Sequence, residues 1–385
     1  MTTFLRGATA LVALGGPLWA SSGTTSDWLG LDEELNSLAS TVTLQGNEPN
    51  FGGLLRTNVL WSDDFNGGTP GAEDLLGADI TDAKLWAQGD VGEIGWRVMM
   101  DFANFGESAP GAGDEVTYLA DLFAGSPGAE YSAQLQDAYA TWNLSESLTL
   151  TFGRFRAPTT RSMWVPSEQL LFQNRSLLGE FGYQFNEGVM LSGSYESNLS
   201  WWLSAQNGID GLEDDLSFNG RVEYALGMPA PTFEGAFLST NEIEATIGVF
   251  YGDEGQLGSG SYLGGDLTAN MGSLSFYGEL TDFDDDWAPV LGSRFGSVFD
   301  AGGATPWSVT LSLMLQPETW EIAARYEELD DLGDTRLLTL GANYYLTGHN
   351  AKAQFNVIDI SSDVDAQEGT IFGLGLVVGL EGYGV

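Results

Sequence analysis

Hydrophobic and polar residues alternate along most of the chain from residue 50 onward. In residues 307–316 the odd positions carry Trp, Val or Leu, and the even positions carry Ser, Thr, Met or Gln. A β-strand sends successive side chains to opposite faces, so this segment predicts a strand with one apolar and one polar face. The same alternation recurs in residues 94–102, 242–251, 274–281 and 320–327.

The number and spacing of these segments favour a barrel. We count roughly sixteen or seventeen of them, each about ten residues long, the length with which a tilted strand crosses a bilayer. Short links such as 143–147 and 316–319 alternate with long ones such as 105–132, 157–181 and 283–305. Short turns at one end and long loops at the other are typical of outer-membrane proteins. We therefore predict an all-β chain: a transmembrane antiparallel β-barrel of about 16 strands over residues 49–385.

The competing folds are a secreted β-sandwich and a β-helix, in which the apolar face forms a core. A sandwich of this length would need two or three domains with linkers, but no Pro/Ser-rich linker and no change of composition follows residue 50. A β-helix shows a fixed short repeat, and none is present. No stretch approaches the run of about 20 apolar residues that a membrane helix needs.

The first residues predict export. Arg6 precedes an uncharged stretch over residues 7–19, and Ala20-Ser21-Ser22 follows with small side chains. This order is typical of a secretory signal peptide, which we assign to residues 1–22 with cleavage near Ala20 or Ser22.

Residues 23–48 are expected to form an N-terminal periplasmic segment with a short helix at 26–39. Ser26 suits the N-cap, and Trp28, Leu31, Leu35 and Leu38 recur on one face of that helix. The helix is either a short surface or plug helix or an oligomerising periplasmic helix.

Charge and composition exclude several functions. The chain has 54 Asp or Glu against 13 Lys or Arg, and its net charge of −41 repels phosphate backbones, so no nucleic-acid partner is expected. It has no Cys, and its single His, His349, excludes a multi-histidine metal site. A Ser–His nucleophile pair would depend on His349, and nothing singles out a carboxylate pair for a glycosidase. We expect no cofactor, no metal site and no enzymatic activity.

Strand parity assigns charged residues to the lumen wall. Because charges on the lipid face cost about 2–4 kcal/mol each at the bilayer midplane, they should collect on the inner face. This rule predicts a nearly balanced wall and leaves most of the acidic excess to the links. The predicted wall residues are Arg56, Lys84, Glu93, Arg97, Asp101, Asp137, Arg221, Glu223, Glu242, Glu244, Glu279, Glu321, Arg325, Glu327 and Lys352.

Four arginines crowd into one segment: Arg154, Arg156, Arg161 and Arg175. Arg154 and Arg156 share the parity of Phe152, so a regular strand would direct both towards lipid. Either a bulge near Gly153 shifts the register, or the strand leaves the membrane there. We expect the chain to leave the strand and enter a long loop that folds inward, with these arginines at or near the constriction.

Three stretches resemble the phosphate-selective porin O/P family. They read Gly153-Arg-Phe-Arg-Ala-Pro158 with Leu170-Leu-Phe-Gln-Asn-Arg175, Asp137-Ala-Tyr-Ala-Thr-Trp142, and residues 340–356. The resemblance covers residues 50–385 and implies a 16-stranded, trimeric diffusion channel with an inward-folded constriction loop and His349 in a turn. The family's selectivity rests on a ladder of Arg and Lys, whereas the lumen bases predicted here are interleaved with acids.

These observations predict a porin in the bacterial outer membrane. Small hydrophilic solutes or ions, anionic or neutral, would diffuse passively through a water-filled barrel, with a local anion preference if the four arginines line the neck. The expected partners are outer-membrane lipid and two further copies of the chain in a homotrimer. The alternative is a non-conducting surface adhesin or envelope scaffold that uses the acidic loops.

Overall fold

The computed structural model describes residues 49–63, 76–103, 134–182, 185–207, 216–253, 260–285, 303–331, 333–363 and 368–380. The chain divides into two compact units, Met1–Pro49 and Asn50–Val385. The signal peptide expected at 1–22 and the helix expected at 26–39 lie outside the described residues. No helix among the described residues is long and apolar enough to cross a membrane.

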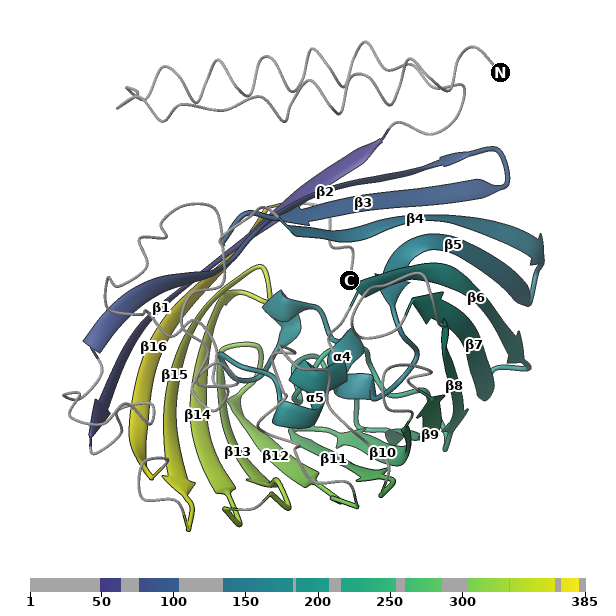
Figure 1. Ribbon diagram of the computed structural model, residues 1–385. Helices are drawn as coiled ribbons and strands as arrows, with labels where there is room; N and C mark the ends of the chain where they lie inside the picture. The colour runs from purple at the N-terminus through teal and green to yellow at the C-terminus, as the bar shows by residue number, and fades with distance from the viewer. Residues whose placement is uncertain are drawn as a thin grey trace, which may run out of the picture. The chain divides into compact units, whose positions relative to one another are not determined.

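The described residues of the second unit form sixteen strands, and among them short helices occur only between β5 and β6 (Figure 1). The strands are β1 (Asn50–Asp63), β2 (Leu76–Val91), β3 (Ile94–Asp101), β4 (Gln134–Ser145), β5 (Leu148–Arg156), β6 (Phe185–Tyr195), β7 (Leu199–Asn207), β8 (Leu216–Ala225), β9 (Glu244–Asp253), β10 (Ser261–Met271), β11 (Leu274–Phe283), β12 (Trp307–Gln316), β13 (Trp320–Glu328), β14 (Arg336–Thr347), β15 (Ala351–Ser361) and β16 (Gly369–Leu380). The helical elements are α4 (Arg161–Trp164), η1 (Ser167–Gln169) and α5 (Leu177–Gly182).

The strands close into a single antiparallel barrel. Each strand pairs with its neighbours in sequence, and β1 closes the ring against β16 in a register that runs from Gly53↔Leu380 to Asp63↔Thr370. Closure removes the free edges on which an open sheet would pair with other chains. The predicted fold, an all-β antiparallel barrel of about 16 strands, is confirmed.

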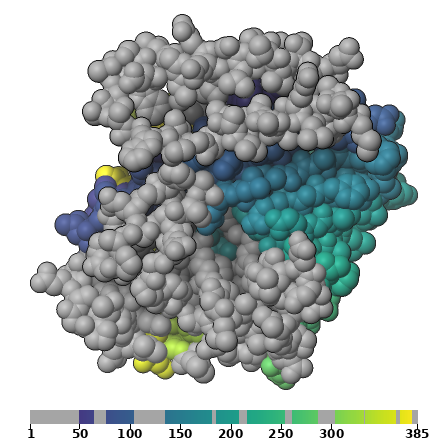
Figure 2. All heavy atoms as spheres, turned by 45° about the horizontal axis from the view of Figure 1, so that its top comes forward, coloured from purple at the N-terminus to yellow at the C-terminus, as the bar shows by residue number. Residues whose placement is uncertain are grey.

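The apolar face of each strand lies on the outside. In β12, Leu311 and Leu315 are more than half exposed, whereas Ser308 and Ser312 on the alternate positions are buried. The outer surface over β3–β6, blue to teal in Figure 2, belongs to this band, on which Phe152 and Val189 are exposed. An apolar exterior around a polar interior reverses the order of a soluble protein and matches the requirements of a bilayer.

The links alternate between two ends of the barrel, which we call the turn end and the loop end. One link at the turn end is far longer than the others: it joins β8 to β9 and covers residues 226–243. The other links at that end cover residues 92–93, 146–147, 196–198, 272–273, 317–319 and 348–350.

The segment between β5 and β6, residues 157–182, folds inside the ring of strands, where Figure 1 shows α4 and α5. We call it the constriction segment. Glycines on the wall make room for it: a Cβ on Gly341 of β14 would lie 2.8 Å from the ring of Phe172. On β16, Gly373 and Gly375 lie in the same way beneath Gln173. The inward-folded loop that the sequence predicted is therefore present.

Candidate functional site: the barrel lumen

The register places most of the predicted wall residues on the inner face. Two predictions were wrong. Glu93 lies exposed in the 92–93 turn, and Glu242 lies exposed in the β8–β9 link, two residues before β9 begins. In both cases the alternation of apolar and polar residues continues beyond the strand into a link, where the side chain's direction no longer depends on whether its position is odd or even. The residues that do lie on inward positions are Arg56, Lys84, Arg97, Asp101, Asp137, Arg221, Glu223, Glu244, Glu279, Glu321, Arg325, Glu327 and Lys352.

Two aspartates that the sequence analysis did not name neutralise bases of the wall. Asp82 of β2 binds Arg56 at 2.6 Å and Lys84 at 2.5 Å. Asp266 of β10 accepts two hydrogen bonds from Arg221, at 2.7 and 2.8 Å. Both aspartates alternate in parity with outward apolar residues, so the rule that found Lys84 and Arg221 applies to them as well.

Other bases of the wall also bind carboxylates. Arg97 donates to Asp137 at 2.9 Å, and Arg325 lies 2.9 Å from Glu327. Lys352, by contrast, donates to the backbone carbonyl of Leu170 in the constriction segment. The wall is therefore a set of ion pairs rather than a continuous ladder of bases.

Glu279 of β11 anchors the constriction segment. Its carboxylate accepts hydrogen bonds from the hydroxyls of Thr160, Ser162 and Ser176, all in that segment. The hydroxyls of Tyr277 on β11 and Ser308 on β12 donate to the same carboxylate from the wall, at 2.7 and 3.1 Å. Hydrogen bonds to an ionised acceptor are stronger than neutral ones, so this buried group holds the segment firmly.

Further bonds attach the segment around the barrel. Arg221 donates to the carbonyl of Thr159 at 2.7 Å, and Asn343 of β14 donates to that of Leu171 at 2.9 Å. On β2, Lys84 donates to Ser167 at 2.9 Å. The segment is thus bonded to strands on several sides of the lumen.

The four arginines predicted at the constriction lie in different places. Arg154 keeps the outward parity of Phe152 and binds Glu187 of β6 at 2.8 Å. β5 continues with regular pairing as far as Arg156. The expected exit of the chain at Gly153 is therefore wrong by three residues. Arg175 is fully buried and donates to the carbonyl of Ser162 at 2.6 Å.

Arg156 and Arg161 are partly buried and contact the interior. Arg156 shares the parity of Arg154, but it is the last residue of β5, and its guanidinium donates to the carbonyl of Met163 in α4. Arg161 donates to the carbonyls of Ala230 and Pro231 in the β8–β9 link, at 2.8 and 2.7 Å, and lies 3.3 Å from Glu223. The structure therefore brings two of the four arginines to the lumen side of the constriction segment.

The lumen is packed on one side and accessible on the other. Along β9 to β16 nearly all described inward side chains are buried under the constriction segment and the β8–β9 link, as Asp266, Ser312, Arg325 and Lys352 illustrate. Along β3 to β7 several inward side chains stay partly exposed, namely Arg97, Tyr139, Thr149, Met190 and Trp202. The partly exposed positions on β3 to β7 therefore mark the side of the described lumen along which a water-filled path would run.

Aromatic rings close one side of this path. Trp164 of α4 meets Trp202 of β7 edge to face, with 4.9 Å between the ring centroids. The constriction segment thus reaches the opposite wall at β7. Among the described residues, the charged groups on this side of the lumen are Arg97 with Asp137, Arg156, and Arg161 with Glu223.

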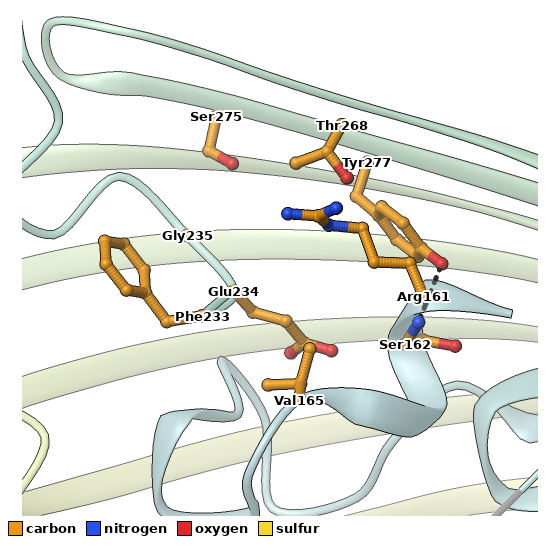
Figure 3. A pocket seen from close by; sticks show the side chains of 9 residues that line it. All are labelled: Arg161, Ser162, Val165, Phe233, Glu234, Gly235, Thr268, Ser275 and Tyr277. Carbon is orange, nitrogen blue, oxygen red and sulfur yellow. Dashed lines mark hydrogen bonds between the residues drawn. The ribbon is translucent and has the colours of Figure 1, made fainter. Parts of the chain in front are cut away.

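A cavity of about 20 Å³ lies where the constriction segment meets the β8–β9 link (Figure 3). Arg161 and Tyr277 line it from one side, and Phe233 and Glu234 from the other. Burial raises the pKa of Glu234, although the amide of Leu171 donates to its carboxylate. The cavity has room for about one water molecule and is too small for a solute.

Searches by sequence match no family model and no curated protein. The fold, however, matches solved outer-membrane proteins over nearly their whole length. OprB of Pseudomonas putida superposes with a TM-score of 0.61 at 11% identity, covering 92% of this chain and 97% of that one. The outer membrane channel DcaP of Acinetobacter baumannii gives 0.54 at 13% identity, covering 87% and 98%. A BenF-like porin from Pseudomonas fluorescens Pf-5 gives 0.53 at 12% identity, covering 87% and 99%. At these identities the likeness establishes the barrel fold.

Proposed function

We propose that this chain is a porin of the bacterial outer membrane, a channel rather than an enzyme, which lets small hydrophilic solutes diffuse down their gradients. One observation carries the proposal: a closed 16-stranded barrel has an apolar exterior and a polar lumen that stays partly accessible along β3 to β7. An apolar exterior is stable in lipid, and a polar wall keeps water in the path. The likeness to outer-membrane channels supports the same function.

Size exclusion and local charge set the selectivity in this proposal. The path is narrowed by a segment that is bonded to the wall, so a solute must fit between α4 and β3–β7. In the described part of the barrel, the path is bordered by three bases, Arg97, Arg156 and Arg161, and by two acids, Asp137 and Glu223. This excess of positive charge supports a mild preference for small anionic over cationic solutes. Acidic loops act less strongly, because exposed charges are screened beyond about 8–10 Å.

Phosphate selectivity of the O/P type has weaker support. The motifs that resemble that family, Gly153–Pro158 and Leu170–Arg175, do lead into and form the constriction segment. The bases of the wall, however, bind carboxylates or backbone carbonyls. We therefore propose that anions pass these bases without tight binding.

Export, assembly and surroundings complete the proposal. A cleaved signal peptide at residues 1–22 would deliver the chain across the inner membrane. Outer-membrane lipid would contact the apolar band, and three copies would assemble as a homotrimer. The long links of the loop end would then face the cell exterior, as in other barrels of this class.

Liposome swelling tests conduction. Vesicles that contain the purified protein should swell in isotonic solutions of small sugars, and empty vesicles should not. A surface adhesin or envelope scaffold would give no flux, and that result would sink the proposal.

Reversal potentials in a salt gradient test the anion preference. Arg156→Ala and Arg161→Ala should each shift the potential towards cation selectivity. Arg154→Ala is the matched control, because Arg154 belongs to the same cluster in sequence but faces outward and binds Glu187. Equal shifts in all three variants would mean that the local charge at the neck does not set selectivity.

A further inference from the structure

The β8–β9 link enters the lumen from the turn end, opposite to the loops. Links at that end otherwise need only two or three residues to reverse the chain. Residues 226–243 instead extend past the strand ends and follow the inner wall. The amide of Ala230 donates to Thr246 of β9 at 3.0 Å, and Asn270 of β10 donates to the carbonyl of Gly235 at 2.8 Å. Further along, the amide of Ala236 donates to Glu321 of β13 at 2.6 Å.

An aromatic cluster fixes the far side of the link. The ring of Phe237 lies 4.7 Å from that of Tyr345 on β14 and 4.9 Å from that of His349 in the β14–β15 turn. The ring of Phe233 also packs against that of His349, with 5.2 Å between the centroids. The link therefore spans the inner wall from β8 to the β14–β15 turn and is held at both ends.

The link also binds the constriction segment directly. Two carbonyls of the link, those of Ala230 and Pro231, accept the guanidinium of Arg161. In the other direction, the carboxylate of Glu234 accepts the amide of Leu171 at 2.8 Å, and the amide of Glu234 donates to Gln169 O at 3.2 Å. Figure 3 shows Glu234 and Arg161 at this junction.

The backbone of the link is stiff rather than loose. Pro229 and Pro231 each fix φ near −65° and so reduce the conformational freedom of the backbone. Gly227 and Gly235 adopt φ of 90° and 92°, where other residues are strained, and so set the two bends. Such a segment is suited to hold one position.

We propose that the β8–β9 link is a second constriction element, which narrows the lumen from the turn end and locks the constriction segment against β9–β14. The two inward segments then act as one block that confines solutes to the path along β3 to β7. The effect of this block on flux rests on the proposed function. The attachment of the β8–β9 link to the constriction segment, which we call the interlock, does not.

Cysteine cross-linking tests the interlock. The protein has no Cys, so a Gln169→Cys, Glu234→Cys double variant provides a single possible disulfide, and the backbone hydrogen bond between these residues brings them within bridging range. Oxidation of the membrane-inserted protein should form the intramolecular bond, detected by mass spectrometry after proteolysis. The two single variants are the controls. Failure of the double variant to cross-link would overturn the proposal.

Conductance tests the constriction. With residues 229–241 replaced by Asn-Gly, single-channel conductance should rise at least about two-fold, because conduction follows the width of the narrowest region. The oxidised and reduced double-cysteine channels should conduct equally. The link already holds the constriction segment in place, so a disulfide between residues 169 and 234 should not change the width of the path. A shortened channel with wild-type conductance, or a reduced channel that conducts more than the oxidised one, would contradict the proposal.

The two proposals fail in different ways. If the wild-type protein conducts nothing but cross-links as described, the porin function fails and the interlock stands. If it conducts but residues 169 and 234 do not cross-link, the interlock fails and the porin function stands.

Discussion

Replacing Glu279 by alanine should release the constriction segment without unfolding the barrel. This carboxylate is buried on β11 and accepts hydroxyls of Thr160, Ser162 and Ser176 from the segment. No other side chain described here receives so many bonds from that segment. Its loss leaves those hydroxyls without their acceptor, while the strand pairing of β11 with β10 and β12 is unaffected.

The magnitude follows from the bonds that detachment breaks. A hydrogen bond to a charged group contributes about 1.5–3 kcal/mol, but the cost of burying the Glu279 carboxylate offsets part of that gain, so we take about 1 kcal/mol for each of the three bonds and about 3 kcal/mol in all. Since each 1.4 kcal/mol corresponds to about a factor of ten, the detached state should become about 10²-fold more populated. Glu279→Gln keeps one acceptor oxygen and should cost about 1 kcal/mol.

Limited trypsin digestion measures the detached population. The segment carries Arg161 and Arg175, both partly or fully buried in the wild-type protein. When opening and closing are fast relative to cleavage, the rate of cutting follows the open population. Mass spectrometry should therefore show cleavage after these residues about 10²-fold faster in Glu279→Ala.

Ser308→Ala provides the matched control. Ser308 donates to the same carboxylate from the wall strand β12 rather than from the segment, so its loss should leave the cleavage rate unchanged. Heat-dependent migration on a gel checks that every variant is a folded barrel. The reasoning is refuted if folded Glu279→Ala is cut at the wild-type rate.

Three further predictions concern the packing of the lumen. Asp266→Asn should destabilise the barrel by about 1.5–3 kcal/mol, because it removes one of the two carboxylates that bind the buried guanidinium of Arg221 and leaves only Glu223. The midpoint of heat unfolding should fall, whereas Asp334→Asn at the exposed Arg336 pair should leave it unchanged. Gly341→Val should push Phe172 away from β14, at a cost of about 1–3 kcal/mol, and should speed trypsin cleavage after Arg175. Gly77→Ala, which adds a methyl group in open space, should leave the cleavage rate unchanged. Burial against aromatic rings and the nearby Lys352 lower the pKa of His349 well below its usual 6.5, so His349 stays neutral in the folded state where it is protonated in the unfolded state. Stability should therefore fall as the pH drops below about 6.5. His349→Phe should abolish that pH dependence of the heat-unfolding midpoint. An equal loss of stability in the His349→Phe variant would mean that other groups carry the pH effect.

Strand parity predicted the wall because both faces of each strand have a fixed environment. Leu311 and Leu315 meet lipid, and Ser308 and Ser312 meet the interior, so the alternation in sequence is the alternation in space. The same rule assigned Arg221 and Arg325 to the inner face, and both lie on inward positions where they are buried. It failed at Glu93 and Glu242, where the chain has left the sheet and a period of two has no meaning.

Arg154 shows the limit of reasoning from composition. Its parity pointed outward, yet a charged residue beside lipid seemed too costly, so the sequence favoured an inward loop from Gly153. The structure keeps it outside near the end of β5, where Glu187 on the neighbouring strand binds it. A partner on another strand cannot be recognised without the register.

The alternation of apolar and polar residues alone determined the closed barrel and the direction of its two faces, because each strand must satisfy lipid and water on opposite sides. It also marked the arginine-rich segment as a loop that folds inward. Only the tertiary structure decided which bases bind which acids, that the β8–β9 link occupies the turn end, and which side of the lumen stays accessible. Those features depend on contacts between residues far apart in the chain, such as Arg161 with Pro231 or Phe237 with His349, and local periodicity carries no information about them.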